Sequence, residues 1–258
     1  MILNWLQEVL LPFIIKVMVH KREKLTQKER RAQARFLSEL LVSKRKTKKP
    51  VVVAMIGLVG SGKSSVAYEL AKYIGATVIE GDKIRIELRK EEERYEGARK
   101  IAENVALEII KNGGNVIFDS DHIDPAKRAS LRAKAKEVGA ELIFIRTYTD
   151  TSDNSEIPGF NLDEMIGRNM TADYTGSADD FFGGAKTPFQ GTDQQKGAVV
   201  KLREMARRLP QHYRWVNKTG GRWVLRKLPF KVFAEINTAY PEWKKKVEKI
   251  TGKILKKF

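Results

Sequence analysis

The sequence contains no cysteine, and its only histidines are His20, His122 and His212. The absence of cysteine excludes disulfide bonds, thiolate metal sites and cysteine nucleophiles, and nothing indicates an oxidising compartment. The three histidines are too scattered for a metal-ligand spacing, so we expect no histidine metal site. With 258 residues, of which 42% are hydrophobic, the chain can bury one substantial core, and we expect one main domain with extended ends.

Acidic residues are outnumbered, which gives a formal net charge of +17, but the excess is unevenly placed. Residues 1–50 carry 13 Lys/Arg against 4 Asp/Glu, residues 51–195 carry 18 against 24, and residues 196–258 carry 18 against 4. An acidic middle between basic ends is typical of a catalytic core whose ends contact an anionic surface. Solubilising lysine on helix faces explains the same pattern equally well.

Residues 1–49 are predicted to form a basic, amphipathic, helical extension. Apolar residues recur at helical spacing from Met1 to Val19, and positive charges follow them instead of preceding them, unlike in a signal peptide. Three roles stay open for residues 1–20: packing on the core or on a partner, attachment to a membrane surface, or a membrane span. We expect a cytoplasmic protein, with membrane association as an option.

The middle of the chain alternates between strand and helix patterns. Val51–Ile56, directly after Pro50, is a β-branched run typical of a strand buried on both faces. Further strands are expected at 77–80, 115–119 and 141–147, and helices at 66–74, 91–112 and 126–138. This alternation predicts an α/β sandwich with a parallel sheet in residues 50–150.

The remaining segments have a different character. Residues 151–197 are rich in Gly, Asp, Thr and Asn and are too long for a simple connection, which predicts a lid or inserted loop. Residues 198–258 form a basic region, in which we expect a helix near Val199–Leu209, a hairpin over Tyr213–Leu225 and an amphipathic helix after Pro241.

The strongest motif is Gly-Leu-Val-Gly-Ser-Gly-Lys-Ser at residues 57–64, a complete G-x-x-x-x-G-K-[ST] sequence between a predicted strand and a predicted helix. Its glycines let backbone amides turn toward phosphates, and the following helix N-terminus favours negative charge. Lys63 is expected to contact the β- and γ-phosphates, and Ser64 to bind Mg²⁺. The predicted nucleotide-binding residues are Gly57, Gly60, Ser61, Gly62, Lys63, Ser64 and Ser65. The fold class is therefore a P-loop NTPase three-layer sandwich, with ATP or another NTP and Mg²⁺ as cofactors.

Acidic residues follow the next two predicted strands, where open parallel sheets bind ligands. Asp82 is placed to accept a proton from an acceptor hydroxyl, and Arg85, three residues later, can bind an anionic acceptor group. A helix N-cap beside a surface arginine is the alternative. Asp119 is expected to hold Mg²⁺ through water. Asp121 is either catalytic or a turn former.

These motifs resemble the P-loop kinases of the polynucleotide-kinase, zeta-toxin and adenylylsulfate-kinase group over residues 51–170. The resemblance is carried by residues 57–64, 81–85, 116–119 and 124–128. It implies that Asp82 is the general base, that Arg85 contacts acceptor phosphate and that Asp119 lies at the metal. It also implies that Arg168 is a lid arginine that stabilises the transferred phosphoryl group. The position of a second lid arginine holds Ala172, a departure from polynucleotide kinases.

The sequence thus predicts an ATP-dependent kinase that transfers the γ-phosphate to an acceptor hydroxyl. A nucleic-acid 5′ end is one acceptor, because the basic C-terminal region interleaves Tyr213, Trp215 and Trp223 with arginines, as contacts to single-stranded nucleic acid require. A nucleotide-like small molecule is another, since alternating aromatics also form half-buried hairpin faces. A P-loop ATPase or nucleotide-sensing module, anchored to a membrane or partner by its ends, is the alternative of a different class.

Overall fold

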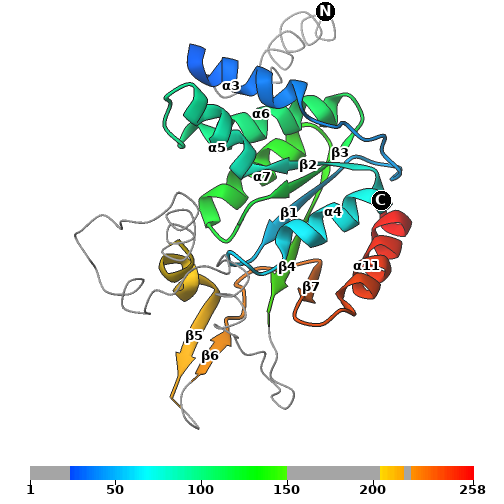
Figure 1. The fold of residues 1–258 in the computed structure, drawn as a ribbon. Coiled ribbons are helices and arrows are strands. Elements are labelled where there is room, and N and C mark those ends of the chain that lie inside the picture. Colours follow the sequence, from blue (N-terminus) through cyan, green and yellow to red (C-terminus); the bar gives the residue numbers. More distant parts are fainter. Residues whose placement is uncertain (1–23, 150–203, 218–221) are drawn as a thin grey trace, which may run out of the picture.

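A five-stranded, fully parallel sheet forms the centre of the molecule (Figure 1), with the strand order β2-β3-β1-β4-β7. The computed structural model describes residues 24–149, 204–217 and 222–258. The strands are β1 (Val51–Ile56), β2 (Ala76–Glu80), β3 (Asn115–Asp119), β4 (Glu141–Tyr148) and β7 (Ala234–Asn237). β1 is buried at every residue, as its β-branched run predicts for a strand covered on both faces.

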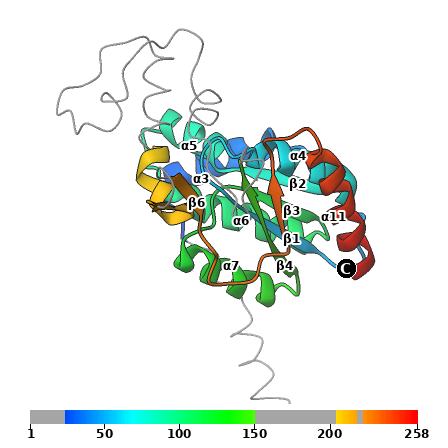
Figure 2. The ribbon, with the colours of Figure 1, turned by 90° about the horizontal axis from the view of Figure 1, so that it is seen from below.

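Helices cover both faces of this sheet, so the predicted three-layer α/β sandwich is confirmed. One face packs against α4 (Lys63–Ile74) and α11 (Trp243–Lys257). The other packs against α5 (Gly81–Lys90), α6 (Gly97–Lys111) and α7 (Pro125–Glu137), and α3 (Gln27–Ser38) lies on α5 and α6. Figure 2 shows α7 and α11 on opposite sides of the sheet. Alternate residues of β1 point into the two cores, Val52 and Ala54 into one, Val51 and Val53 into the other.

One predicted helix is present but begins later than expected. A helix was expected from 91 to 112, but α5 ends at Lys90 and α6 spans only Gly97–Lys111, so residues 91–96 form the turn between the two helices. Glutamate favours helix, so the run of glutamates at 91–93 predicts that the helix already begins there. In the structure the chain turns there, with Glu92 at a φ of 53°. The turn is held by α3: Arg31 and Arg35 each pair with Glu91 at 2.6 Å. Part of the N-terminal basic charge is therefore neutralised within the chain.

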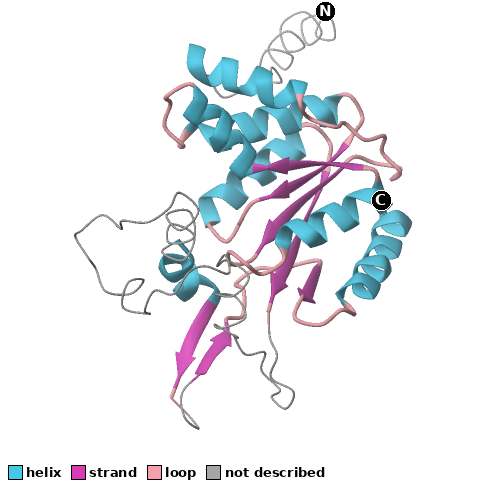
Figure 3. Ribbon diagram, in the orientation of Figure 1, coloured by secondary structure: helices cyan, strands magenta, loops and turns pink. Residues whose placement is uncertain are grey.

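The chain after residue 203 contributes to the core as well as to a projecting hairpin. β7 is the edge strand beside β4, and α11 packs on α4 through Val247, Ile250 and Ile254. The predicted hairpin is present as β5 (Tyr213–Val216) and β6 (Arg222–Leu225), which pair antiparallel and stand apart from the main sheet (Figure 3). The proposed division at 1–49, 50–150, 151–197 and 198–258 stays a prediction.

Two of the predicted segments lie outside the described residues. These are the amphipathic start from Met1 to Val19 and the lid or insert at 151–197. Within residues 24–149, 204–217 and 222–258, none of the helices has the length and apolar character needed to cross a bilayer. The possible membrane role of residues 1–20 therefore stays a prediction.

Candidate active site

The loop from Gly57 to Gly62 joins the carboxyl end of β1 to the first turn of α4, at the centre of the sheet. Gly62, which precedes α4, has a φ of 76°, a left-handed conformation that favours glycine. A Cβ at Gly57 would lie 2.7 Å from the carbonyl oxygen of Thr147, so no larger residue fits there. The helices after β1 and β3 leave toward opposite faces of the sheet. Such a switch point is where open α/β sheets bind ligands.

Buried hydroxyl groups hold this loop in shape. The Ser61 hydroxyl is fully buried and lies 2.8 Å from the Thr147 hydroxyl, with which it shares a hydrogen bond. Thr238, which follows β7, donates to the Ser61 carbonyl at 3.1 Å. The Ser61 side chain, predicted to bind nucleotide, is thus bound to β4. Ser61 therefore contributes to a nucleotide site by shaping the backbone of the loop, and not through its hydroxyl group.

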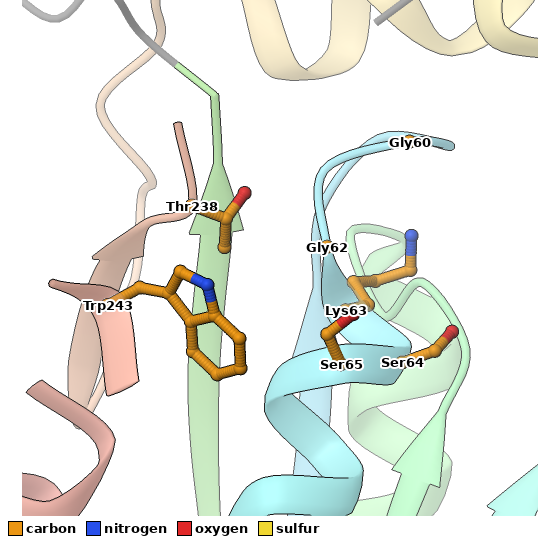
Figure 4. A pocket seen from close by; sticks show the side chains of 7 residues that line it. All are labelled: Gly60, Gly62, Lys63, Ser64, Ser65, Thr238 and Trp243. Carbon is orange, nitrogen blue, oxygen red and sulfur yellow. The ribbon is translucent and has the colours of Figure 1, made fainter. Parts of the chain in front are cut away.

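A pocket of about 390 Å³ opens beside the loop and the first turn of α4. It is lined by Gly60, Gly62, Lys63, Ser64, Ser65, Thr238 and Trp243. The first five of these were predicted from the motif. Thr238 and Trp243 were not, because they lie about 180 residues away along the chain and join the loop only through the parallel pairing of β7 with β4. Figure 4 shows Trp243 facing the pocket from the side opposite Ser65.

Lys63 stands between the loop and a group of carboxylates. Its ammonium group donates a hydrogen bond to the Leu58 carbonyl at 2.9 Å. Burial lowers the pKa of Lys63 from its ordinary value, and the guanidinium of Arg208 lowers it further, whereas the carboxylates of Asp121, Asp119 and Asp82 raise it. The net direction is downward. A phosphate anion bound beside Lys63 would add to the stabilisation of its charged form.

Ser64 and Asp119 lie together, as a magnesium site of this type requires. The Ser64 side chain is close enough to the Asp119 carboxylate to lower its pKa. Burial raises the pKa of Asp119 overall, and Ser64 and the charge of Lys63 act in the opposite direction. Within the described parts of the chain, no three His, Asp or Glu side chains are grouped to hold a metal on their own. The donor pair fits a Mg²⁺ that takes its other ligands from water and phosphate oxygens.

Asp82 and Arg85 lie at the start of α5, one strand further along the same sheet edge. Their side chains form an ion pair, and the Asp82 side chain is 88% exposed. The Cα register aligns Glu80 at the end of β2 with Asp119 at the end of β3, so α5 begins next to the Ser64–Asp119 pair. The structure thus brings Asp82, Arg85, Asp119 and Lys63 to one edge of the sheet. Arg168, the predicted lid arginine, lies outside the described residues.

Asp121 is neither exposed nor unpaired, and it binds the P-loop to a distant helix. Its Oδ1 accepts from the amides of Gly57 at 3.3 Å and Ile123 at 3.2 Å. Its Oδ2 is 3.2 Å from the Arg208 guanidinium and 3.0 Å from His212 Nε2. Burial opposes ionisation of Asp121, but the His212 contact, the charge of Lys63 and the Gly57 amide outweigh it, and the pKa lies below its usual range.

Apolar contacts reinforce this connection. Helical residues 204–212 pack on the P-loop residue Leu58 through Met205 and Leu209, and Tyr213 joins the same cluster. Arg146, fully buried on β4, donates to the carbonyls of Arg226 at 2.8 Å and His212 at 3.3 Å. No local pattern pointed to Arg208 or His212, because their partner Asp121 is 87 and 91 residues away along the chain.

The parallel sheet and the G-x-x-x-x-G-K-S loop at the end of its central strand define a P-loop NTPase fold. Residues 52–153 match the model of the protein family AAA_33, described as an AAA domain. This match confirms the P-loop domain that the motifs predict.

Among known proteins, the chain is 32% identical over 116 residues to the bifunctional enzyme NodQ of Rhizobium meliloti (strain 1021), an alignment that covers 41% of the chain. The match spans only 17% of the length of that protein. Among solved structures it is similar to the APS kinase CysC of Mycobacterium tuberculosis, with 17% identity, a TM-score of 0.44 and coverage of 79% of this chain and 96% of the other. It is also similar to a gluconokinase of Sinorhizobium meliloti 1021, with 17% identity, a TM-score of 0.43 and coverage of 80% of this chain and 94% of the other. At TM-scores below 0.5, these similarities do not decide between activities.

Proposed function

We propose that the chain is an ATP-dependent kinase that transfers the γ-phosphate of Mg·ATP to an acceptor hydroxyl. The proposal is supported above all by one juxtaposition. The P-loop with Lys63 and Ser64 at the end of β1, and Asp82 with Arg85 at the end of β2, flank Asp119 at the same sheet edge. A phosphate donor and a carboxylate next to an acceptor are the two parts that phosphoryl transfer needs.

Each residue has a distinct part in the proposed transfer. The amides of the loop and the α4 N-terminus bind the phosphates, and Lys63 moves from the Leu58 carbonyl to the β- and γ-oxygens. Asp82 accepts the proton of the acceptor hydroxyl as it attacks, and Arg85 binds an anionic group of the acceptor. Mg²⁺ bound beside Ser64 and Asp119 would supply positive charge to the phosphate oxygens. Trp243 offers an aromatic face for the nucleobase at the far side of the pocket.

A nucleic-acid 5′ end remains one acceptor supported by a specific feature. Trp215 in the hairpin is 53% exposed and makes an edge-to-face contact with Trp223 across the two strands. Exposed aromatic rings next to basic residues suit the stacking of unpaired bases. Tyr213, by contrast, is buried against Leu58, so only the outer part of the hairpin is available for such contacts. A nucleotide-like small molecule is the other acceptor class.

The test is a screen for transfer of labelled γ-phosphate to RNA ends, DNA ends, nucleosides and nucleotide sugars. We expect Asp82→Asn to lower kcat by about 10²–10⁴-fold, the usual effect of losing a general base, while ATP binding is kept. Lys63→Ala should lose both phosphate transfer and ATP binding. Glu141→Gln is the control, because Glu141 is an exposed carboxylate at the start of β4, the opposite edge of the sheet. ATP hydrolysis that is unchanged in Asp82→Asn, without any labelled acceptor, would favour the ATPase or nucleotide-sensing alternative.

A further inference from the structure

Three cationic side chains from separate elements converge on the loop between β3 and α7. The Arg85 guanidinium and the Ser120 side chain both lie within 4 Å of the position that a Cβ atom on Gly81 would take, at the start of α5. Arg208, from the helical residues 204–212, pairs with Asp121 at 3.2 Å. Lys127 lies in the first turn of α7, where its amide donates to the N-cap Asp124 at 3.0 Å. This group is defined here as the β3–α7 cation cluster.

Two of the three cations have carboxylate partners and one does not. Arg85 pairs with Asp82, and Arg208 pairs with Asp121 and Glu204. For the Lys127 ammonium group, the described part of the chain supplies no hydrogen-bond acceptor or ion-pair partner within bonding distance, although the side chain is half-buried. Among the described residues, the cluster therefore contains one half-buried positive charge without a direct counter-charge.

The surroundings of Lys127 disfavour its charge. Burial lowers its pKa, Arg208 lowers it further, the carboxylates of Asp121 and Asp124 raise it, and Arg85 lowers it again. The net direction is downward. A half-buried ammonium that is repelled by two guanidinium groups becomes favourable when an anion binds between them. The N-termini of α5 and α7 start at the same sheet edge and add positive potential there.

We propose that the kinase acceptor carries an oxyanion, such as a phosphate, sulfate or carboxylate group, and that Lys127 binds it as a specificity-determining residue beside Arg85 and Arg208. This inference rests on the proposed function, since the cluster lies on the side of Asp82 where an acceptor hydroxyl would enter. It distinguishes anionic from neutral acceptors, which the fold alone does not, because a neutral alcohol or nucleoside would leave the Lys127 charge unmatched.

A first test needs no known acceptor. With the P-loop filled by Mg²⁺ and a non-hydrolysable ATP analogue, the rate of acylation of Lys127 by an amine-reactive ester is measured by peptide mass spectrometry, with and without inorganic phosphate or sulfate. We expect either ion to slow the modification of Lys127 several-fold. Lys136 is the internal control, since it is exposed on the last turn of the same helix. Equal slowing or no slowing at both lysines would overturn the proposal, whether or not the chain is a kinase.

A second test uses the acceptors found by the transfer screen. Lys127→Met should raise KM for an anionic acceptor by about 10- to 100-fold, the equivalent of one charge-assisted hydrogen bond, with a much smaller change in kcat. Lys127→Arg should restore most of the loss, and Lys136→Met should behave as the wild type. Panels of phosphorylated, sulfated and carboxylated acceptors distinguish the oxyanion. Transfer to neutral acceptors as efficient as to anionic ones, or an unchanged KM in Lys127→Met, would refute the inference and leave the kinase proposal intact.

Discussion

Replacement of Asp121 by asparagine tests whether the buried contacts of this carboxylate hold the P-loop in place. Asparagine has the same shape, and its carbonyl oxygen can still accept from the amides of Gly57 and Ile123. Its amide nitrogen, however, would replace Oδ2 opposite Arg208 and His212, which donate to that position. The substitution therefore sets donors against donors in a site where the Asp121 side chain is only 6% exposed.

The expected loss of stability depends on the ion pair that Arg208 keeps in the variant. Breaking a buried ion pair by removing one partner costs about 3–5 kcal/mol. Arg208 retains its pairing with Glu204 and is 19% exposed, so part of its charge stays compensated. We therefore expect the lower end, about 3 kcal/mol, which corresponds to a fall in Tm of about 6–12 °C for a chain of this size.

The assay is urea and thermal unfolding of Asp121→Asn beside Asp124→Asn. Asp124 caps α7 on the surface of the same loop, and asparagine caps helices about as well, so we expect a loss of about 1 kcal/mol or less there. Because the pKa of Asp121 is lowered from 3.8, its stabilisation is present above that pH and is lost as the pH falls below it. The difference between wild type and Asp121→Asn should shrink accordingly in acid. A loss of stability in Asp121→Asn no larger than that in Asp124→Asn would show that the buried contacts of Asp121 do not hold the P-loop in place.

Three further predictions concern the nucleotide pocket and the core. Trp243→Ala should raise KM for ATP by about 5- to 150-fold, the cost of losing one base stacking contact, and should leave inhibition by inorganic tripolyphosphate unchanged; equal losses for both would contradict a base contact. Because the pKa of Lys63 is lowered and a bound triphosphate raises it, binding of Mg·ATP should take up protons and weaken as the pH rises through the lowered pKa. Calorimetry in buffers of different ionisation enthalpy measures this uptake, which should vanish in Lys63→Met. Asn115→Leu should cost about 2 kcal/mol in urea unfolding, because the buried amide of Val51 loses its acceptor at 2.8 Å, and an unchanged midpoint would show that this amide finds another partner.

The elements of the α/β core were predictable because their signals are local. The β-branched run of β1 is buried on both faces, and β3 occupies the predicted residues 115–119. The P-loop followed from a contiguous motif whose glycines adopt positive φ angles in the structure. The late start of α6 was not predictable, since the glutamates at 91–93 favour helix and the arginines that hold the turn come from α3, about 60 residues earlier.

Residues brought to the site by tertiary structure carried no such signal. Asp121 could be named as a turn former or catalytic residue from its place after β3, but its partners Arg208 and His212 are known only once the helical residues 204–212 pack on Leu58. Trp243 lies in the amphipathic helix that is predicted after Pro241, and it reaches the pocket because β7 pairs with β4. Long-range pairings of this kind depend on the whole fold, which a single sequence does not specify locally.

Every proposed role depends on the loop at the end of β1 binding a magnesium-complexed triphosphate through Lys63. The most direct measurement is equilibrium binding of Mg²⁺ and a non-hydrolysable ATP analogue to the wild-type chain and to Lys63→Ala. We expect binding by the wild type that depends on Mg²⁺ and is weakened by at least about tenfold in Lys63→Ala, as for a lost charge-assisted contact. Equal binding by the two proteins, or no binding by the wild type at any Mg²⁺ concentration, would show that this loop does not bind a triphosphate through Lys63.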